Sequence, residues 1–169
     1  MNQYEIPHIK HWLDYLYYEV CKGEFDFYLQ YSEKDGVMTK WKKYSEVCFD
    51  FENPKNKWFL SKVNQRQILP CEVVLDLESQ EELQPALSKL RSFNLPYYVF
   101  STGSRGFHIH IFFKRKLSSE EKHTIIKYFG ADTMKAGDKC LIALEFTPHW
   151  KSGKIKELVS GECENAKLL

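Results

Sequence analysis

The sequence predicts an α+β fold, in which amphipathic helices pack against antiparallel strands. Of the 169 residues, 43% are hydrophobic and 15% aromatic, which is enough apolar material for the core of one domain. Apolar residues recur at helical spacing in some segments and alternate with polar residues in others. From Cys71 onward these segments follow the order strand, helix, strand, strand, helix, strand, which is the ferredoxin-like or RRM-like order.

Residues 1–70 predict a smaller N-terminal layer of a helix and a β-hairpin. The apolar stripe of His8–Lys22 has a helical period and ends at Gly23. Glu24–Trp41 alternates polar and apolar residues around a Lys-Asp-Gly turn, which is typical of a hairpin. Tyr44–Asn53 is a candidate third strand that ends in an Asn-Pro break.

Residues 71–169 predict the antiparallel sheet and its two helices, so that 1–169 form a single domain of two layers. The first helix has Ser79 as its N-cap and Glu82 three residues on, which is the spacing of a capping box. The second helix begins at Ser118 or Ser119 and stops at Gly130. The predicted elements are the strand Cys71–Ser79, the helix Ser79–Phe93, the strands Tyr97–Thr102 and Phe107–Lys114, the helix Leu117–Gly130, and the strands Cys140–Phe146 and Ile155–Val159.

The net charge of +1 hides an uneven distribution of charge. Residues 53–70 carry Lys55, Lys57, Lys62 and Arg66 and no acidic residue. Basic residues interleaved with aromatic ones suit a nucleic-acid backbone. A solvated surface of mixed charge explains the charge pattern equally well.

The five cysteines are scattered, and no two are spaced as C-x-x-C. This pattern argues against a disulfide framework and against a structural zinc site, and it favours reduced thiols. The N-terminus lacks an apolar signal core, and no run approaches the roughly 18 apolar residues of a membrane span. We therefore expect a cytoplasmic protein with no membrane partner.

Two carboxylates, Asp76 and Glu78, come at the end of the first apolar strand of the sheet layer. Residues two apart on a strand face the same side, so these carboxylates emerge together, roughly 6 to 7 Å apart along the chain. Oxygen ligands placed in this way suit a hard divalent cation, Mg²⁺ or Mn²⁺, that keeps waters or takes a substrate phosphate. A D-x-E pair alone is a weak signal, because most such pairs are ordinary charges at the end of a strand.

The segment TGSRGFHIH (102–110) is a more specific signal. Its two glycines allow the backbone to approach a ligand closely. Ser104 and Arg105 offer a hydroxyl and a guanidinium to phosphate oxygens, and His108 offers an imidazole N–H. A plain hairpin turn followed by two surface histidines is the alternative interpretation.

The segment PHWKSGKIK (148–156) is a third cluster of polar residues. His149, Lys151 and Ser152 lie close together beside a glycine, and such loops bind anions through side chains and backbone N–H groups. The segment lacks the GxxxxGK[ST] pattern of a P-loop, and on its own it is typical of a basic surface turn.

In this order the three motifs resemble those of the archaeo-eukaryotic primase superfamily, above all the catalytic core of the DNA primase small subunit. VVLDLE (73–78) is similar to the family's apolar strand ending in D-x-D/E, and TGSRGFHIH to its S-G-x-R-G-x-H turn, with Thr102 where serine is usual. HWKSG (149–153) is similar to the H-x-K-T-G loop, and GEFDFYLQY (23–31) to an R-E-F stretch, with glycine in place of arginine. The zinc ligands and the extra helical subdomain of full-length small subunits are absent, so the sequence looks like a stripped core.

The resemblance implies the fold of a primase catalytic core and template-directed joining of nucleoside triphosphates, of the DNA primase or polymerase type. It implies that Asp76, Glu78 and a third acid hold Mg²⁺ or Mn²⁺. We expect Asp132 as the third acid, with Glu145 as the alternative third carboxylate and Asp138 after both. The residues expected to bind the nucleotide are Thr102, Ser104, Arg105, His108, His149, Lys151 and Ser152.

The partners implied are nucleoside triphosphates and a single-stranded DNA template with its primer, and further a larger primase subunit or a helicase. The basic stretch from Lys55 to Arg66 is a candidate for contacts with template phosphates, with Trp58 or Phe59 stacking a base. We expect the strand of His108 to lie beside the strand of Asp76. His110, about 7 Å further along, fits a structural role as well as a ligand contact.

Two other functions fit the same residues. The first is a module with a primase-like fold that binds nucleotides or single strands without catalysis. The second is a metal-dependent phosphodiesterase or nuclease, in which His108 and His110 coordinate the metal directly and the nucleic acid is degraded. Incorporation of labelled nucleotides on a single-stranded template separates the three.

Overall fold

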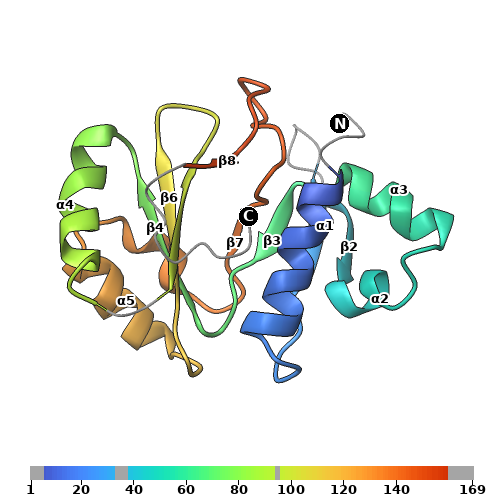
Figure 1. Cartoon of the computed structure of the whole chain (residues 1–169), viewed down its shortest axis with the longest axis horizontal. Helices are drawn as coiled ribbons and strands as arrows, with labels where there is room; N and C mark the ends of the chain where they lie inside the picture. Colours follow the sequence, from blue (N-terminus) through green and yellow to red (C-terminus); the bar gives the residue numbers. More distant parts are fainter. Residues whose placement is uncertain (1–5, 33–37, 94–95, 160–169) are drawn as a thin grey trace. The chain divides into compact units, whose positions relative to one another are not determined.

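The structure is a computed structural model, and it describes residues 6–32, 38–93 and 96–159 (Figure 1). The chain divides into two compact units. Unit 1 comprises Met1–Gln67 and Leu141–Lys156, and unit 2 comprises Ile68–Cys140 and Glu157–Leu169. Each unit contains a four-stranded antiparallel sheet with helices, so the predicted α+β class is confirmed. None of the helices in the described part of the chain has the length and apolar character that a membrane span requires.

Unit 1 is built on a sheet of strand order β2-β1-β3-β7. Its first helix, α1, continues into a π-helical turn, η1, and the apolar stripe predicted for this helix is buried, with Ile9, Trp12, Leu13 and Leu16 inaccessible to solvent. Its elements are α1 (Ile6–Asp14), η1 (Tyr15–Val20), β1 (Tyr28–Ser32), β2 (Met38–Lys43), α2 (Tyr44–Cys48), α3 (Pro54–Lys62), β3 (Gln65–Gln67) and β7 (Leu141–Ala143).

The predicted hairpin is present as β1 and β2, which pair in antiparallel register; the Lys-Asp-Gly turn at 34–36 lies outside the described residues. The third strand predicted over Tyr44–Asn53 is wrong, because the chain forms α2 there. Tyr44 and Val47 are buried three residues apart, which is helical spacing, and the Glu46 carboxylate accepts the backbone N–H of Lys43 to begin the turn.

The position of the strand predicted over Cys140–Phe146 also needs correction. Only Leu141–Ala143 is extended, and it pairs with β3 of unit 1 instead of completing the sheet of unit 2. The pairing places Ile142 opposite Arg66, and the backbone N–H of Leu144 is donated to the carbonyl of Asn64. The following carboxylate, Glu145, is buried among cationic groups of the same unit, and this burial accounts for the placement of β7.

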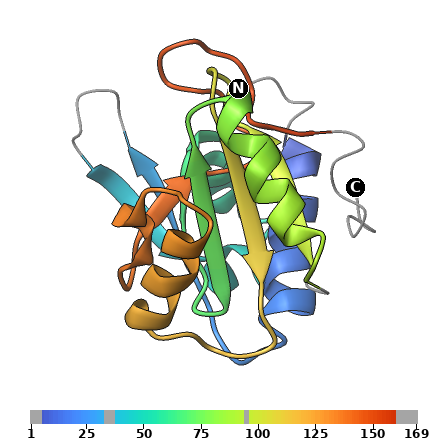
Figure 2. The same ribbon diagram turned by 90° about the vertical axis from the view of Figure 1, so that its left-hand side faces the viewer.

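Unit 2 is built on a sheet of strand order β4-β6-β5-β8. The helices α4 and α5 cover one face of this sheet (Figure 2). Apolar side chains of both helices and of β4, β5 and β6 form one buried core there. The elements are β4 (Glu72–Leu77), α4 (Gln80–Leu90), β5 (Tyr97–Ser101), β6 (Phe107–Phe112), α5 (Ser119–Tyr128), η2 (Thr133–Ala136) and β8 (Glu157–Leu158).

Both helices of unit 2 begin at the predicted residues. Ser79 accepts the N–H of Glu82 at the start of α4, although the Glu82 carboxylate accepts the N–H of Glu78 and not that of Ser79. Ser118 and Glu121 form the full capping box of α5. These caps fix where α4 begins after β4 and where α5 begins after β6.

Candidate functional site

Asp76 and His108 lie directly opposite each other on β4 and β6. The His108 Nε2 atom is 3.5 Å from an Asp76 carboxylate oxygen. The Asp76 side chain is 44% exposed, whereas that of His108 is 9% exposed, so the carboxylate reaches solvent while the imidazole beside it is mostly covered. The prediction that the acidic strand and the histidine strand are neighbours is confirmed.

The turn between β5 and β6 packs against the end of β4. A Cβ atom on Gly106 would lie 2.7 Å from the carbonyl oxygen of Leu77 and 3.7 Å from the Cα of Glu78, so only glycine fits this approach. Thr102 closes the turn, since its hydroxyl donates to the Gly106 carbonyl and accepts the N–H of Ser104. The structure thereby brings the glycine turn next to the predicted carboxylate pair.

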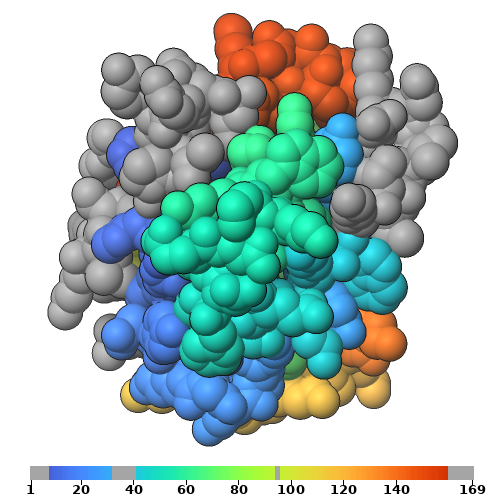
Figure 3. Space-filling model, turned by 90° about the vertical axis from the view of Figure 1, so that its right-hand side faces the viewer, coloured from blue at the N-terminus to red at the C-terminus, as the bar shows by residue number. Residues whose placement is uncertain are grey.

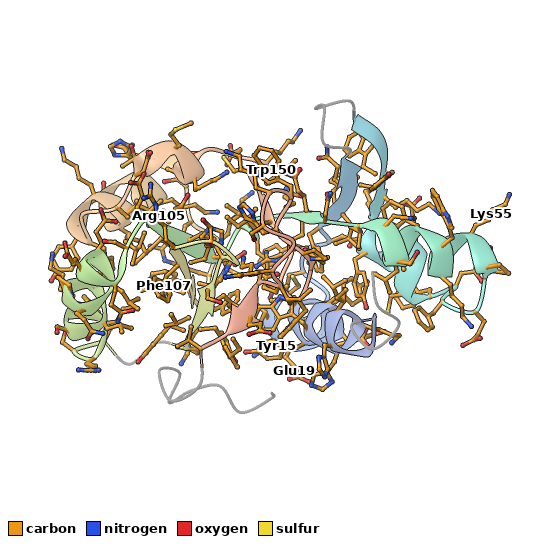
Figure 4. All side chains as sticks on the ribbon, turned by 90° about the horizontal axis from the view of Figure 1, so that it is seen from above. Tyr15, Glu19, Lys55, Arg105, Phe107 and Trp150 are labelled. Atoms are coloured by element: carbon orange, nitrogen blue, oxygen red, sulfur yellow. The ribbon has the colours of Figure 1, made fainter. Side chains whose placement is uncertain are left out.

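Ser104 and Arg105 lie at the exposed tip of this turn, and Gly103 adopts a positive φ of 79° there (Figure 4). Glu78 is also exposed, just beyond the end of β4. The edge of unit 2 therefore presents two carboxylates, a hydroxyl and a guanidinium from adjacent segments. Acidic and basic groups of this kind can hold a cation and the phosphate oxygens bound to it.

His110 is a structural residue in this sheet. Its Nδ1 lies 2.7 Å from the Glu72 carboxylate, both side chains are inaccessible to solvent, and the rings of Phe100 and His108 pack edge-on against it. The other Glu72 oxygen accepts the backbone N–H of Leu69. The contact between His110 and Glu72 therefore links β6, the strand that carries His108, to β4.

The third carboxylate is not brought into contact with the first two. Asp132 is exposed and caps η2 by accepting the N–H of Met134, although η2 itself packs against β4. Asp138 accepts the hydroxyl of Ser119. Across residues 6–32, 38–93 and 96–159, no three His, Cys, Asp or Glu side chains are grouped so that they could hold one metal ion together.

Glu145, the alternative third carboxylate, is buried in unit 1 and bound by three side chains. Its two oxygens accept from Trp12 Nε1 at 2.8 Å, from Arg66 Nε and Nη2 at 2.9 and 3.0 Å, and from Lys156 Nζ at 3.3 Å. A cation at Glu145 would have to displace these donors. Lys156 also donates to the carbonyl of Ala143, so the network ties β3, α1 and the end of β7 together.

The predicted anion-binding segment is a β-hairpin that starts and ends beside this buried network. Lys156 donates its N–H to the carbonyl of Thr147, and Pro148 and Ile155 form a bridge. At the tip, the His149 Nδ1 atom accepts the backbone N–H groups of Lys151 and Ser152 at 3.2 and 3.3 Å.

That geometry needs a lone pair on Nδ1, so the assigned tautomer of His149 carries its proton on Nε2. The side chains of Lys151 and Ser152 are exposed, and the Trp150 ring stacks on the His149 ring. The hairpin thus presents an imidazole N–H, an ammonium and a hydroxyl, all suited to phosphate oxygens.

The basic stretch from Lys55 to Arg66 does not act as one surface. Arg66 is fully buried with Glu145 and is not available to a nucleic acid, and Phe59 is 1% exposed, which is too little for its ring to stack a base. Trp58 is 46% exposed. Most of the stretch forms α3, a helix that was not predicted although Asn53 at the N-cap and Pro54 at the first helical position are strong start signals.

Comparison with known proteins gave matches in structure alone. No known family profile and no curated protein sequence matches the chain. The archaeo-eukaryotic primase (AEP) domain of the primase-polymerase of cyanophage S-2L superposes with a TM-score of 0.55 over 87% of this chain and 88% of that domain, at 13% identity. The polymerase domain of Mycobacterium tuberculosis ligase D, solved in complex with DNA, superposes with a TM-score of 0.55 over 92% of this chain and 80% of that domain, at 10% identity.

The chain has the fold of an archaeo-eukaryotic primase domain. The likeness covers both units, since more than four fifths of the chain is aligned to each structure. The predicted resemblance and the predicted α+β primase-core fold are confirmed on this ground. At 10 to 13% identity the likeness establishes the primase-type fold and leaves the activity to be argued from the residues.

Proposed function

We propose that this protein is a template-directed nucleotidyltransferase of the primase-polymerase type. The observation that carries the proposal is the edge of unit 2, where Asp76 and Glu78 lie beside His108 and a glycine turn that carries Arg105. The structural neighbours with the same fold are a primase-polymerase and a DNA-bound polymerase domain, which supports nucleotides and DNA as partners.

The proposed reaction joins two nucleotides. A 3′-hydroxyl oxygen forms a bond to the α-phosphorus of a nucleoside triphosphate, the bond from that phosphorus to the bridging oxygen of the β-phosphate breaks, and pyrophosphate leaves. The hydroxyl proton passes to solvent or to a nearby base. Positioning of phosphates and neutralisation of their charge are the main tasks of the protein in such a reaction.

The carboxylate pair fits a hard divalent cation. Asp76 is partly exposed, Glu78 is exposed, and both offer oxygen ligands at the end of one strand. Two carboxylates together with substrate phosphates and water form a set that Mg²⁺ accepts. Bound there, the cation would lower the pKa of the attacking hydroxyl and offset the charge of the leaving pyrophosphate. Asp132 is proposed as the third carboxylate because the turn it caps packs against β4.

The remaining residues are proposed as phosphate donors. In unit 2, Ser104 and Arg105 would bind the triphosphate from the exposed turn, and His108 would donate its imidazole N–H beside Asp76, with Thr102 keeping the turn in shape. In unit 1, the hairpin with His149 Nε2, Lys151 and Ser152 is a second group of donors in its own right. A larger primase subunit or a helicase as a partner stays a prediction from the resemblance.

The test is incorporation of a labelled nucleoside triphosphate on a primed single-stranded template, with Mn²⁺ or Mg²⁺. We expect incorporation by the wild type and a loss of about a hundredfold or more in Asp76→Asn, because a metal ligand carries several kcal/mol of transition-state stabilisation. Glu81→Gln, which removes an acidic side chain from the exposed first turn of α4, is the matched control and should keep full activity.

Other results identify the competing functions. Shortening of the primer or template strand in place of extension of the primer would support the nuclease. If the wild-type protein binds nucleotides but incorporates none with either cation, the result would support the non-catalytic binding module.

A further inference from the structure

A pocket of about 420 Å³ lies on unit 1, and none of the residues that line it takes part in the proposed reaction. Five side chains from β2 and from α3 line it, namely Lys42, Pro54, Lys55, Trp58 and Phe59. Figure 3 looks onto this side of unit 1, with the residues of α2 and α3 in teal at the centre of the view. The pocket combines aromatic rings and cations, and its lining contains no acidic side chain.

The aromatic part of the pocket is fixed in place. Phe59 is 1% exposed and forms the buried floor, while Trp58 is 46% exposed at the rim. Tyr31 of β1 packs edge-on against the Trp58 ring, with the ring centroids 6.4 Å apart. An indole held on a helix and open to solvent over nearly half its surface offers a rigid platform for a planar ligand.

The cationic part is held in place as well. The Lys42 ammonium donates to the Asn56 side-chain oxygen at 2.8 Å and lies 5.5 Å from the centroid of the Phe59 ring. Asn56 is itself buried, and its amide group donates to the carbonyls of Glu46 and Asp50. Lys42 is therefore held toward the pocket by a buried side chain, and the exposed Lys55 in the first turn of α3 adds a second cation (Figure 4).

We infer that this pocket binds one nucleotide of a single-stranded nucleic acid, with its base against Trp58 and its phosphate between Lys42 and Lys55. An aromatic platform beside two cations matches both parts of a nucleotide, and stacking accepts any base because every base has a π-face. An acidic peptide would use the two lysines but would leave the indole without a planar partner. The site needs neither the carboxylate pair nor a divalent cation, so it goes beyond the proposed reaction.

The test measures binding of a fluorescein-labelled oligothymidylate to the full chain by fluorescence anisotropy, without nucleoside triphosphate or divalent cation. We expect Trp58→Ala to weaken binding roughly 5- to 150-fold, the range measured for loss of one base-stacking side chain. Trp58→Phe should keep most of the affinity. Lys42→Gln should weaken binding and lower the slope of log affinity against log salt by about one, because one phosphate contact is lost.

Two matched controls keep the test specific. Trp41→Ala removes another exposed tryptophan of unit 1, which packs on Tyr28 outside the pocket, and it should bind like the wild type. Lys57→Gln removes a lysine of α3 that is paired with Glu52, and it should leave the salt slope unchanged. Circular dichroism confirms that each variant is folded, which we expect because these side chains are at least partly exposed.

Three outcomes would overturn the inference. They are wild-type affinity in Trp58→Ala, equal losses of affinity in Trp58→Ala and Trp41→Ala, and an equal loss of affinity in Lys42→Gln and Lys57→Gln. The result is separable from the proposed function, because Asp76→Asn should bind the oligonucleotide normally while its incorporation of nucleotides falls about a hundredfold or more. Trp58-dependent binding by a chain that never incorporates nucleotides would support the pocket and reject the polymerase.

Discussion

His108 on β6 lies directly opposite Asp76 on β4, with its Nε2 atom 3.5 Å from the carboxylate. Strand pairing sets this relationship, and a slip of one residue in the register would send the two side chains to opposite faces of the sheet. Backbone hydrogen bonds and the buried core under the sheet thus hold a titratable pair at the edge where the glycine turn also packs. We therefore expect Asp76 or His108 to be replaceable without unfolding unit 2.

The first prediction compares the two histidines of β6. His108→Asn should stay folded and raise the KM for nucleoside triphosphate about tenfold to a hundredfold, because a donor to a charged phosphate is worth about 1.5–3 kcal/mol. His110→Asn should lower the free energy of unfolding by about 1–3 kcal/mol, because it removes a buried hydrogen-bond partner of Glu72. Incorporation kinetics and urea unfolding of both variants give the answer. An unchanged KM in His108→Asn would exclude its role in nucleotide binding.

The second prediction concerns the close approach at Gly106. Gly106→Ala would place a Cβ atom 2.7 Å from the Leu77 carbonyl, so the turn must move away from β4 or the strand must shift. We expect a cost of about 1–3 kcal/mol in stability and a loss of incorporation. Gly137→Ala is the matched control, since its Cβ would meet only the Cys140 Sγ at 3.4 Å and its φ of −69° suits alanine. Equal effects of the two substitutions would show that the turn is not packed as described.

Local signals in the sequence were sufficient to predict most of unit 2. The alternation in β6, the apolar run of β4 and the serine caps of α4 and α5 depend on residues close in the chain, and the structure contains all of them. The ferredoxin-like order of strands and helices along the chain also predicted that β4 and β6 are adjacent in the sheet.

The partner of β7 could not be predicted in the same way. The strand has three residues, and its position depends on Glu145, whose partners Arg66 and Trp12 are 79 and 133 residues away in the sequence. The periodicity of apolar residues along the chain cannot predict a contact between residues so far apart in the sequence. Nothing in the sequence around Arg66 indicates that its side chain is buried. The same limitation led to the wrong expectation for Arg66 as a surface residue.

The third prediction follows from this buried network. Arg66→Met should lower the free energy of unfolding by about 3–5 kcal/mol, because Glu145 keeps a buried charge with less compensation. The double variant Arg66→Met/Glu145→Leu should recover part of the loss, since both members of the pair are then replaced by apolar groups. Urea unfolding of the single and double variants measures the difference. A double variant less stable than the single one would show that Glu145 stabilises the fold mainly through Trp12 and Lys156.

The fourth prediction is a dependence of stability on acid pH. The Arg115 guanidinium, which pairs with Glu121 at the start of α5, lowers the pKa of that carboxyl from 4.5 to about 2. The folded state therefore binds fewer protons than the unfolded state in this interval. The stabilisation is complete above the unfolded pKa and is lost as the pH falls toward 2. Urea midpoints at about pH 6 and about pH 3 should differ less in Glu121→Gln than in the wild type, and an equal difference would contradict the assignment.

The last prediction separates the shape of the unit 1 hairpin from its proposed contact with phosphate. In His149→Asn the side-chain oxygen can replace Nδ1 as acceptor for the N–H groups of Lys151 and Ser152, but the Nε2 donor is gone. In His149→Ala both are lost. Amide hydrogen exchange at the tip should therefore speed up only in the alanine variant, which isolates the structural effect.

Nucleotide affinity should then fall in both His149 variants by about tenfold to a hundredfold, the equivalent of one hydrogen bond to a charged group. Isothermal titration with a non-hydrolysable triphosphate measures this. Lys151→Gln should weaken binding as well, whereas Lys154→Gln removes the same charge from the same hairpin without touching the proposed donors and should bind normally. If the asparagine variant binds like the wild type, the imidazole acts only as the acceptor that shapes the tip, and the phosphate contact must be assigned to other residues.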